Sequence, residues 1–165
     1  MSQVSNNPVE IGFVDLVSRC AHVIVVKDLQ KAVVVFEATL SKETSFRKTG
    51  ETTYRETARL FRVVRILKSD SLKIGDEIKV WREPAYDFEL VKMYHTTGVS
   101  VSPEMLTYTA VHPPQGDEWI VFLSGPSRHE GVWTQYLDAA EGLAAEPDLL
   151  AALKAPPPAR GILPL

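Results

Sequence analysis

The chain has too few cysteines for a disulfide-stabilised or cysteine-bound zinc domain. Cys20 is the only cysteine among the 165 residues. A single thiol cannot form a disulfide within the chain, and it leaves no Cys-x-x-Cys pair to hold zinc. This usage suits a reducing compartment. Cys20 also lies on the apolar stripe of a predicted helix, which favours a buried thiol over a nucleophile.

Catalytic and metal-binding motifs are also missing. The sequence contains no H-E-x-x-H motif, no phosphate-binding glycine loop and no G-x-S-x-G motif. Its four histidines, His22, His95, His112 and His129, are far apart in sequence, and no Ser–His–Asp triad stands out. We therefore predict no enzymatic activity, no catalytic residues, no cofactor and no metal. An active site assembled from distant residues is the alternative.

Long hydrophobic runs are absent as well. The longest apolar run is far shorter than a membrane span. The opening residues, MSQVSNNPVE, have neither the basic region nor the apolar region of a signal peptide. These features predict a cytoplasmic protein with no membrane association. A removed signal followed by an added Met1 would leave the same sequence.

The composition is that of an ordinary globular domain, with 45% hydrophobic and 24% charged residues. Residues 1–80 carry 13 Lys and Arg against 10 Asp and Glu, a balance of +3, and residues 81–165 carry 5 against 11, a balance of −6. Interleaved strands would average this asymmetry out; otherwise the first half forms an electropositive face. We predict one domain over residues 1–155 and an extended proline-rich tail over 156–165, because successive prolines prevent a helix.

The first half of the chain predicts one helix followed by strands. Residues 8–20 have helical spacing of apolar side chains, with Asn7 as the cap. Residues 21–26 are β-branched and predict a buried strand, and residues 27–30 are short enough for a hairpin connection. A second strand follows at 31–40. Its predicted inner face consists of Ala32, Val34, Phe36, Ala38 and Leu40. The polar residues 41–53 then predict a long loop.

The stretch from 55 to 81 allows two interpretations. Its arginines, at 55, 59, 62 and 65, would line one face of a helix. A basic helix would indicate nucleic acid or membrane. However, the apolar residues between 60 and 67 would cover too wide an arc of a helix, and the segment is rich in β-branched residues. We therefore predict a strand hairpin around Gly75, with Ile78 and Val80 facing inward.

The second half predicts fewer elements. A short helix is expected near residues 87–94, a weak strand at 105–111, and a turn at 113–117. Residues 118–125 predict a strong buried strand. A segment of helical character is expected after RHEGVWTQYL, residues 128–137, and Pro147 suits the first turn of a helix within it.

Three stretches, LVSRCAHVIVV, FRVVRILKSDSLKIGDEIKVW and DEWIVFLSG, resemble bacterial relatives of the netrin-like and metalloproteinase-inhibitor barrel. The resemblance implies a mainly β fold: an OB-like five-stranded Greek-key barrel with an N-terminal helix and a short helical C-terminal segment. Inhibitors of that family place an N-terminal cysteine at a protease zinc. This chain begins Met1-Ser2-Gln3 without an early cysteine pair, so the activity is not carried over. Lys27 also stands where the family usually has glycine.

These features predict a non-catalytic binding module that recognises a protein partner, in the role of an inhibitor or an immunity-type antagonist. Aromatic and arginine side chains are the usual anchors of such surfaces. The candidate partner-binding residues are Arg47, Lys48, Tyr54, Arg55, Lys79, Trp81, Trp133 and Tyr136. The alternative is single-stranded nucleic-acid binding on a basic groove with stacking aromatics. The acidic net charge counts against that alternative, and Trp81 could instead pack beneath the C-terminal helix.

Overall fold

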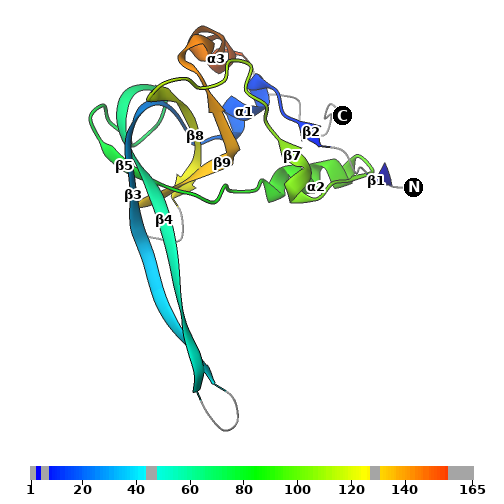
Figure 1. Ribbon diagram of the computed structural model, residues 1–165. Helices are drawn as coiled ribbons and strands as arrows, with labels where there is room; N and C mark the ends of the chain where they lie inside the picture. The colour runs from blue at the N-terminus through cyan, green and yellow to red at the C-terminus, as the bar shows by residue number, and fades with distance from the viewer. Residues whose placement is uncertain (1–2, 5–7, 44–47, 127–130, 156–165) are drawn as a thin grey trace.

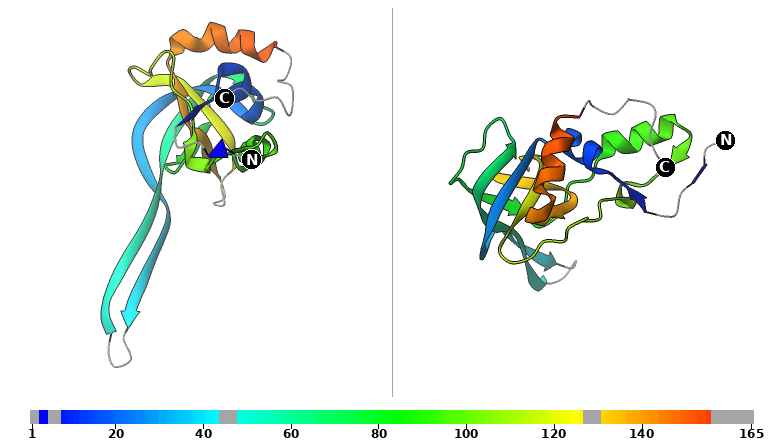
Figure 2. Two further views of the ribbon diagram at one scale, coloured as in Figure 1. Left: turned by 90° about the vertical axis from the view of Figure 1, so that its right-hand side faces the viewer. Right: turned by 90° about the horizontal axis from the view of Figure 1, so that it is seen from above.

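The structure is a computed structural model that describes residues 3–4, 8–43, 48–126 and 131–155. A closed barrel forms the body, and a long two-stranded arm projects from it on the side away from the last helix (Figures 1 and 2). No helix among the described residues is both long enough and apolar enough to cross a membrane.

The barrel has the strand order β3-β4-β5-β9-β8. Its strands are β3 (His22–Glu43), β4 (Lys48–Lys68), β5 (Glu77–Trp81), β8 (Glu118–Pro126) and β9 (Val132–Glu141). Four of the five pairings that close it are antiparallel, and only β5 and β9 run parallel. Counted along the chain, the barrel strands are therefore ordered 1-2-3-5-4. This arrangement confirms the expected mainly β, OB-like five-stranded barrel.

The arginine-bearing stretch is a strand, as predicted. β4 runs without a break through residues 54–68 and pairs with β5 around the turn at Gly75. Gly75 has a φ of 95°, a conformation that glycine adopts without strain. Ile78 and Val80 point inward and are buried.

The core has two layers. The inner layer fills the barrel with side chains from β3, β4, β5 and β8: Ile24, Val26, Phe61, Val63, Ile78, Val80, Val121 and Leu123. The outer layer lies between the barrel wall and the helices α1 (Phe13–Arg19), α2 (Phe88–Thr96) and α3 (Glu146–Leu153). Val23 and Val25 of β3 and Phe122 of β8 belong to this outer layer. β3 and β8 are therefore buried on both faces within the barrel.

Short elements connect these parts. Two small parallel pairings join the N-terminal region to the segment after α2. They are β1 (Gln3–Val4) with β6 (Val99–Ser100), and β2 (Val9–Glu10) with β7 (Leu106–Thr107). Single 3₁₀ turns occur at Pro103–Met105 and Leu143–Ala145.

The N-terminal helix is shorter than predicted. It begins at Phe13, after Gly12, which provides no side-chain cap. Residues 9–10 instead pair with β7, because tertiary strand pairing outweighs the helical spacing there. The predicted cap, Asn7, lies outside the described residues. The C-terminal half of the predicted apolar stripe of this helix is confirmed, and Cys20 is buried.

The hairpin predicted at residues 27–30 is wrong. β3 continues through this region and merely changes register with β4 between Asp28 and Ala32. Gln30 takes a φ of 57°, and its N–H donates to Asp28 Oδ1 at 2.8 Å. This local irregularity accommodates the polar residues without reversing the chain.

The loop predicted at 41–53 is also wrong, because β3 and β4 stay paired as far as Glu43 and Lys48. The predicted inner face of 31–40 is wrong as well: Val34, Phe36 and Leu40 are exposed.

The remaining predictions are mostly confirmed. α2, β8 and α3 form where expected, and Pro147 lies in the first turn of α3. The strand expected at 105–111 is limited to the two residues of β7, and β9 was not predicted at all. The tail over 156–165 lies outside the described residues.

Candidate partner-binding surface

The arm consists of the parts of β3 and β4 that extend beyond the barrel, residues 32–43 and 48–57. β8 pairs with β3 only as far as Lys27, and β5 pairs with β4 only from Ala58 onward. No described strand therefore pairs with the outer edge of either arm strand. Such edges present backbone N–H and C=O groups to a further strand.

Strand register sorts the arm's side chains into two faces of different chemistry. Phe36 lies opposite Glu56, Ala38 opposite Tyr54, and Leu40 opposite Thr52. We call Phe36, Ala38, Leu40 and Tyr54 the apolar face of the arm; the register puts Thr52 and Glu56 on the same side. The polar face consists of Glu37, Thr39, Thr53 and Arg55. Paired residues of antiparallel strands share a face, so this division follows from the register alone.

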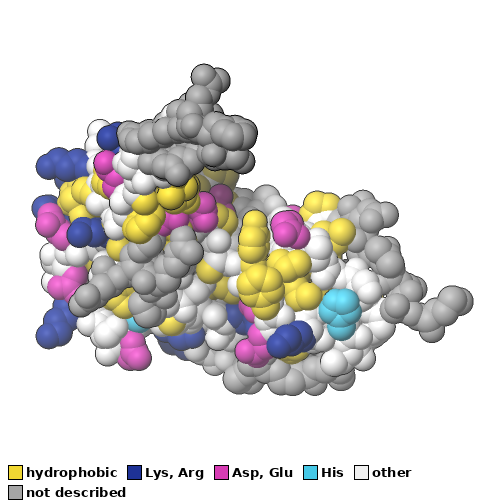
Figure 3. All heavy atoms as spheres, turned by 90° about the horizontal axis from the view of Figure 1, so that it is seen from below, with side chains coloured by type: hydrophobic (Ala, Val, Ile, Leu, Met, Phe, Trp, Pro, Cys, Tyr) yellow, Lys and Arg dark blue, Asp and Glu magenta, His cyan; other side chains and the backbone are white. Residues whose placement is uncertain are grey.

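The apolar face is solvent-exposed. Phe36 is 42% exposed, Leu40 61% and Tyr54 45%. Seen from below, roughly along the arm, the molecule shows hydrophobic side chains at its surface beside charged ones (Figure 3). Exposed apolar side chains that share one face mark an interaction surface more strongly than scattered ones.

Contacts within the arm hold the aromatic side chains in place. The rings of Phe36 and Tyr54 meet edge to face with centroids 6.2 Å apart. The Tyr54 hydroxyl donates to Glu56 Oε1 at 2.8 Å, and Glu56 is buried. On the polar face, Arg55 Nε donates to Glu37 Oε2 at 2.9 Å. These contacts fix the two rings relative to each other and to Glu56.

The four arginines of β4 are each paired with a separate carboxylate. The pairs are Arg55 with Glu37 at 2.9 Å, Arg59 with Asp28 at 2.6 Å, Arg62 with Glu77 at 3.4 Å, and Arg65 with Glu146 at 3.0 Å. Their positive charge is matched residue by residue. The strand does not create the concentrated cationic surface that strong phosphate binding requires.

A groove of about 350 Å³ lies at the base of the arm. Arg59, Trp81, Arg82, Gln135 and Asp138 are among its lining residues. The Arg59 guanidinium carbon lies 5.3 Å from the Phe61 ring centroid and 5.4 Å from that of Trp119. Asp138 has a φ of 61°, which marks an irregularity of β9 beside the groove. We call this the base groove.

The candidate residues from the sequence are distributed over several places. Tyr54 and Arg55 lie on opposite faces of the arm, and Lys79 is exposed on β5. Trp81 lines the base groove. The backbone of Lys48 begins β4, and Arg47 lies outside the described residues.

Trp133 and Tyr136 lie elsewhere. The Trp133 ring meets the buried His22 ring edge to face at 4.8 Å. Tyr136 is 3% exposed, and its hydroxyl donates to Asp87. Both side chains are engaged in packing within the body of the protein.

The exposed positions Phe36 and Leu40 were assigned to the core from sequence. Alternation by itself is the same for a buried strand and an exposed amphipathic one. The partner strand carried the only signal: residues 49–57, TGETTYRET, offer Tyr54 as their single large apolar side chain. A strand paired with so polar a neighbour has little to pack against.

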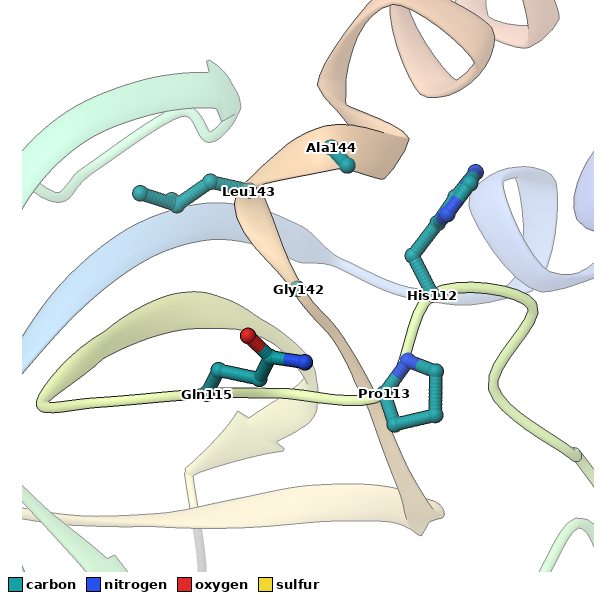
Figure 4. A pocket seen from close by; sticks show the side chains of 6 residues that line it. All are labelled: His112, Pro113, Gln115, Gly142, Leu143 and Ala144. Carbon is teal, nitrogen blue, oxygen red and sulfur yellow. The ribbon is translucent and has the colours of Figure 1, made fainter.

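A pocket of about 360 Å³ lies between the segment that precedes β8 and the turn after β9 (Figure 4). Its residues are His112, Pro113, Gln115, Gly142, Leu143 and Ala144. The neighbouring Glu141 is fully buried and accepts hydrogen bonds from Tyr108 Oη at 2.7 Å and His112 N at 2.9 Å. These contacts fasten the segment to β9, so we interpret this region as structural.

Burial shifts the pKa of two titratable groups in the body of the protein. Burial raises the pKa of the Cys20 thiol, which opposes nucleophilic reactivity. Burial also lowers the pKa of His22, whose Nδ1 lies 2.7 Å from Ser69 Oγ. No cluster of three or more metal-ligating side chains occurs within the described ranges.

A comparison with known protein families finds no family model that matches the chain, and a comparison with curated proteins finds no match. Function is therefore inferred from geometry.

Proposed function

We propose that this protein is a non-catalytic binding module that recognises a protein partner through the apolar face of its arm. The observation that carries the proposal is the exposure of Phe36, Leu40 and Tyr54 on one face of a projecting ribbon. In its more specific form, the proposal is that the protein acts as an inhibitor or antagonist of that partner.

Covering this face would be favourable. Burial of apolar surface contributes roughly 25 cal/mol per Å². A two-stranded ribbon without further packing is marginally stable in water, so a partner would also stabilise the arm itself. The unpaired edges offer a second mode of contact, in which a partner strand adds to the ribbon.

The reach of the arm supports an antagonist role. Residues 32–43 span roughly 35 Å at the usual rise per strand residue. A ribbon of that length can enter a cleft in a partner while the barrel stays outside. The same geometry would hold the barrel over the mouth of that cleft.

Single-stranded nucleic-acid binding is the second candidate, and the base groove favours it. The groove places Arg82 and Trp81 on the β4–β5 face that OB folds use for oligonucleotides. Arg59 is already paired with Asp28, however, and Asp138 adds a carboxylate to the groove. This charge pattern gives the nucleic-acid proposal less support.

Affinity capture with matched double variants tests the proposal. Phe36→Ser with Leu40→Ser alters the apolar face, and Glu37→Gln with Arg55→Gln alters the polar face of the same ribbon segment. A partner captured stoichiometrically from native lysate by the unmodified protein should bind the polar-face variant. It should bind the apolar-face variant at least about tenfold more weakly, because interface anchors cost about 2 kcal/mol or more when lost.

Two results would contradict the proposal. One is equal capture by both double variants, which would exclude the apolar face as the contact. The other is tight binding of a labelled single-stranded oligonucleotide whose affinity falls steeply as salt is raised from about 50 to about 200 mM, as counterion release requires. Loss of that binding on Arg59→Ala and Arg82→Ala would identify the base groove as the site.

A further inference from the structure

The outer edge of β3 in the arm lacks the features that normally keep an exposed edge from pairing. Residues 32–40, AVVVFEATL, contain no Lys, Arg or Pro, and Glu37 is their only charged residue. β8 stops pairing with β3 at Lys27, so no described strand meets this edge. Natural edges are usually protected by lysines, prolines, bulges or short length, and an apolar edge without such protection tends to accept a further strand.

The regular part of this edge lies toward the tip of the arm. The register of β3 with β4 shifts between Val34 and Phe36 and does not shift again before Lys42. A further strand needs a regular edge, because a bulge disrupts the hydrogen-bond ladder where it occurs. The pairing segment is therefore expected within residues 36–42.

This segment is complementary to itself in the antiparallel direction. A two-fold axis perpendicular to the ribbon at Ala38 places Phe36 of one copy opposite Leu40 of the other. Glu37 then faces Thr39, so no like charges oppose each other. Ala38 faces its own counterpart, where a small side chain allows close approach. Opposed residues of antiparallel strands share a face, so both apolar faces lie on the same side of the joined ribbon.

Neighbouring registers are less favourable. An axis at Glu37 would oppose two carboxylates, and like charges directly opposite each other destabilise a strand pair. An axis at Thr39 would place Ala38 instead of Phe36 opposite Leu40, with loss of the larger apolar contact. Intermediate registers are excluded by the pleat, because this axis pairs only residues that point to the same face. The side chains therefore favour the register centred on Ala38.

The arm is long enough to keep the two barrels apart. Residues 32–38 span roughly 20 Å at the usual rise per residue, so the barrels would lie at opposite ends of the joined ribbon. The arm projects from the barrel without another described element beside it (Figures 1 and 2). Joining two arms gives four strands, and three or more strands with an apolar face are needed for independent stability.

We propose that two copies of this protein pair through the outer edges of β3, antiparallel and centred on Ala38, to form a four-stranded ribbon. Its apolar side carries Phe36, Leu40 and Tyr54 from each copy. This inference names the occupant for strand addition to the arm, and it rests on the proposed function only in taking the arm as the binding element. So short a contact belongs to the weak class of interfaces, so the expected dissociation constant is about 10–100 μM.

Sedimentation velocity over a series of protein concentrations tests the pairing. The unmodified protein should be monomeric at about 1 μM and mostly dimeric at about 500 μM. Ala38→Lys should raise the dissociation constant at least about fivefold, because two ammonium groups meet at the axis. Thr39→Lys is the matched control: it adds the same charge one residue away, opposite Glu37 of the second copy, and should leave the dissociation constant unchanged or lower it.

Cysteine substitutions locate the axis. Ala38→Cys should form a disulfide-linked dimer when oxidised by dissolved oxygen, because only a residue at the axis lies opposite itself, at the Cα separation of about 4.5–5.5 Å that a disulfide can bridge. Thr39→Cys should not, because it is offset from its counterpart by two residues, which places the Cα atoms more than about 7 Å apart. Cys20 is 2% exposed and should not compete.

Two results would overturn the pairing. One is an unmodified protein that remains monomeric at about 500 μM. The other is an equal effect of the two lysine variants, which would place the contact outside this register. Capture of a different protein from lysate is a separate readout. A monomeric chain that captures such a partner through this edge would refute self-pairing and leave the proposed function standing, whereas a dimer that captures nothing would support self-pairing alone.

Discussion

The two halves of β3 resemble each other in sequence and differ completely in environment. HVIVV, residues 22–26, lies in the barrel, and Val23 to Val26 are 0% exposed. AVVVF, residues 32–36, lies in the arm, where Val34 is 54% exposed. In the barrel, β8 pairs with the edge of β3 that faces away from β4, and helices cover the outer face of β3. In the arm no described strand pairs with either outer edge and Val34 is exposed, so neighbours rather than composition decide burial.

The ion pairs of the two regions show the same contrast. Arg19 and Asp87 are buried in the body, whereas Arg55 and Glu37 on the arm are 62% and 47% exposed at their side chains. Removing one partner of a buried pair strands a charge in a poorly solvated site. Removing one partner of an exposed pair leaves the other in water. The following predictions measure how different the two regions are.

The largest effect is expected for Asp87→Ala. This change removes the partner of Arg19, the acceptor of Tyr136 and the cap of α2. The free energy of unfolding, measured by urea denaturation, should fall by about 3–5 kcal/mol. Glu37→Ala on the arm is the matched control and should cost less than about 1 kcal/mol. Equal losses at the two positions would contradict the contrast.

A matched pair of leucine substitutions should give the next largest difference. Leu123→Ala in the barrel interior should lower the free energy of unfolding by about 2–5 kcal/mol, since it removes a fully buried side chain. Leu40→Ala on the arm should stay within about 0.5 kcal/mol. A loss above about 1.5 kcal/mol at Leu40 would show that the apolar face is already covered.

His22 should make the stability of the body depend on pH. Its folded pKa lies below the unfolded value of about 6.5, so the unfolded chain takes up the proton first as pH falls. Stability should be full above about pH 6.5 and should decline below it until the folded pKa is passed. The loss should be smaller than that from Leu123→Ala. His22→Gln should flatten this part of the stability–pH curve, and an unchanged curve would exclude His22 as the cause.

The smallest effect is expected for Arg55→Ala. Its pair with Glu37 is exposed, so stability should change by less than about 1 kcal/mol. The difference from the unmodified protein should shrink as salt screens the pair. A larger loss that persists at high salt would indicate that Arg55 supports the arm through packing.

The candidate surfaces were only partly predictable. Tyr54, Arg55 and Trp81 were selected as aromatic or arginine anchors, and the structure places them on the arm and in the base groove. Phe36 and Leu40 were assigned to the core, because alternation does not reveal whether a second layer exists.

Other errors share a physical cause. β9 escaped prediction because WTQYLDAAE lacks clean alternation and because Leu137 and Asp138 have φ values of 48° and 61°. Residues 9–10 left the predicted helix because a strand partner was available at Leu106. In both cases contacts with distant segments outweighed local preference.

By itself the sequence determined which central segments are extended. Runs of β-branched residues and the turn at Gly75 favour strand over helix at short range, and the arginines between 55 and 65 do not change this. Only the tertiary structure decided which parts of those strands are buried and which are exposed. β8 and β5 stop pairing at Lys27 and Ala58, so the same ribbon is core on one side of that point and exposed surface on the other. Burial depends on neighbours supplied by distant parts of the chain, which local patterns do not encode.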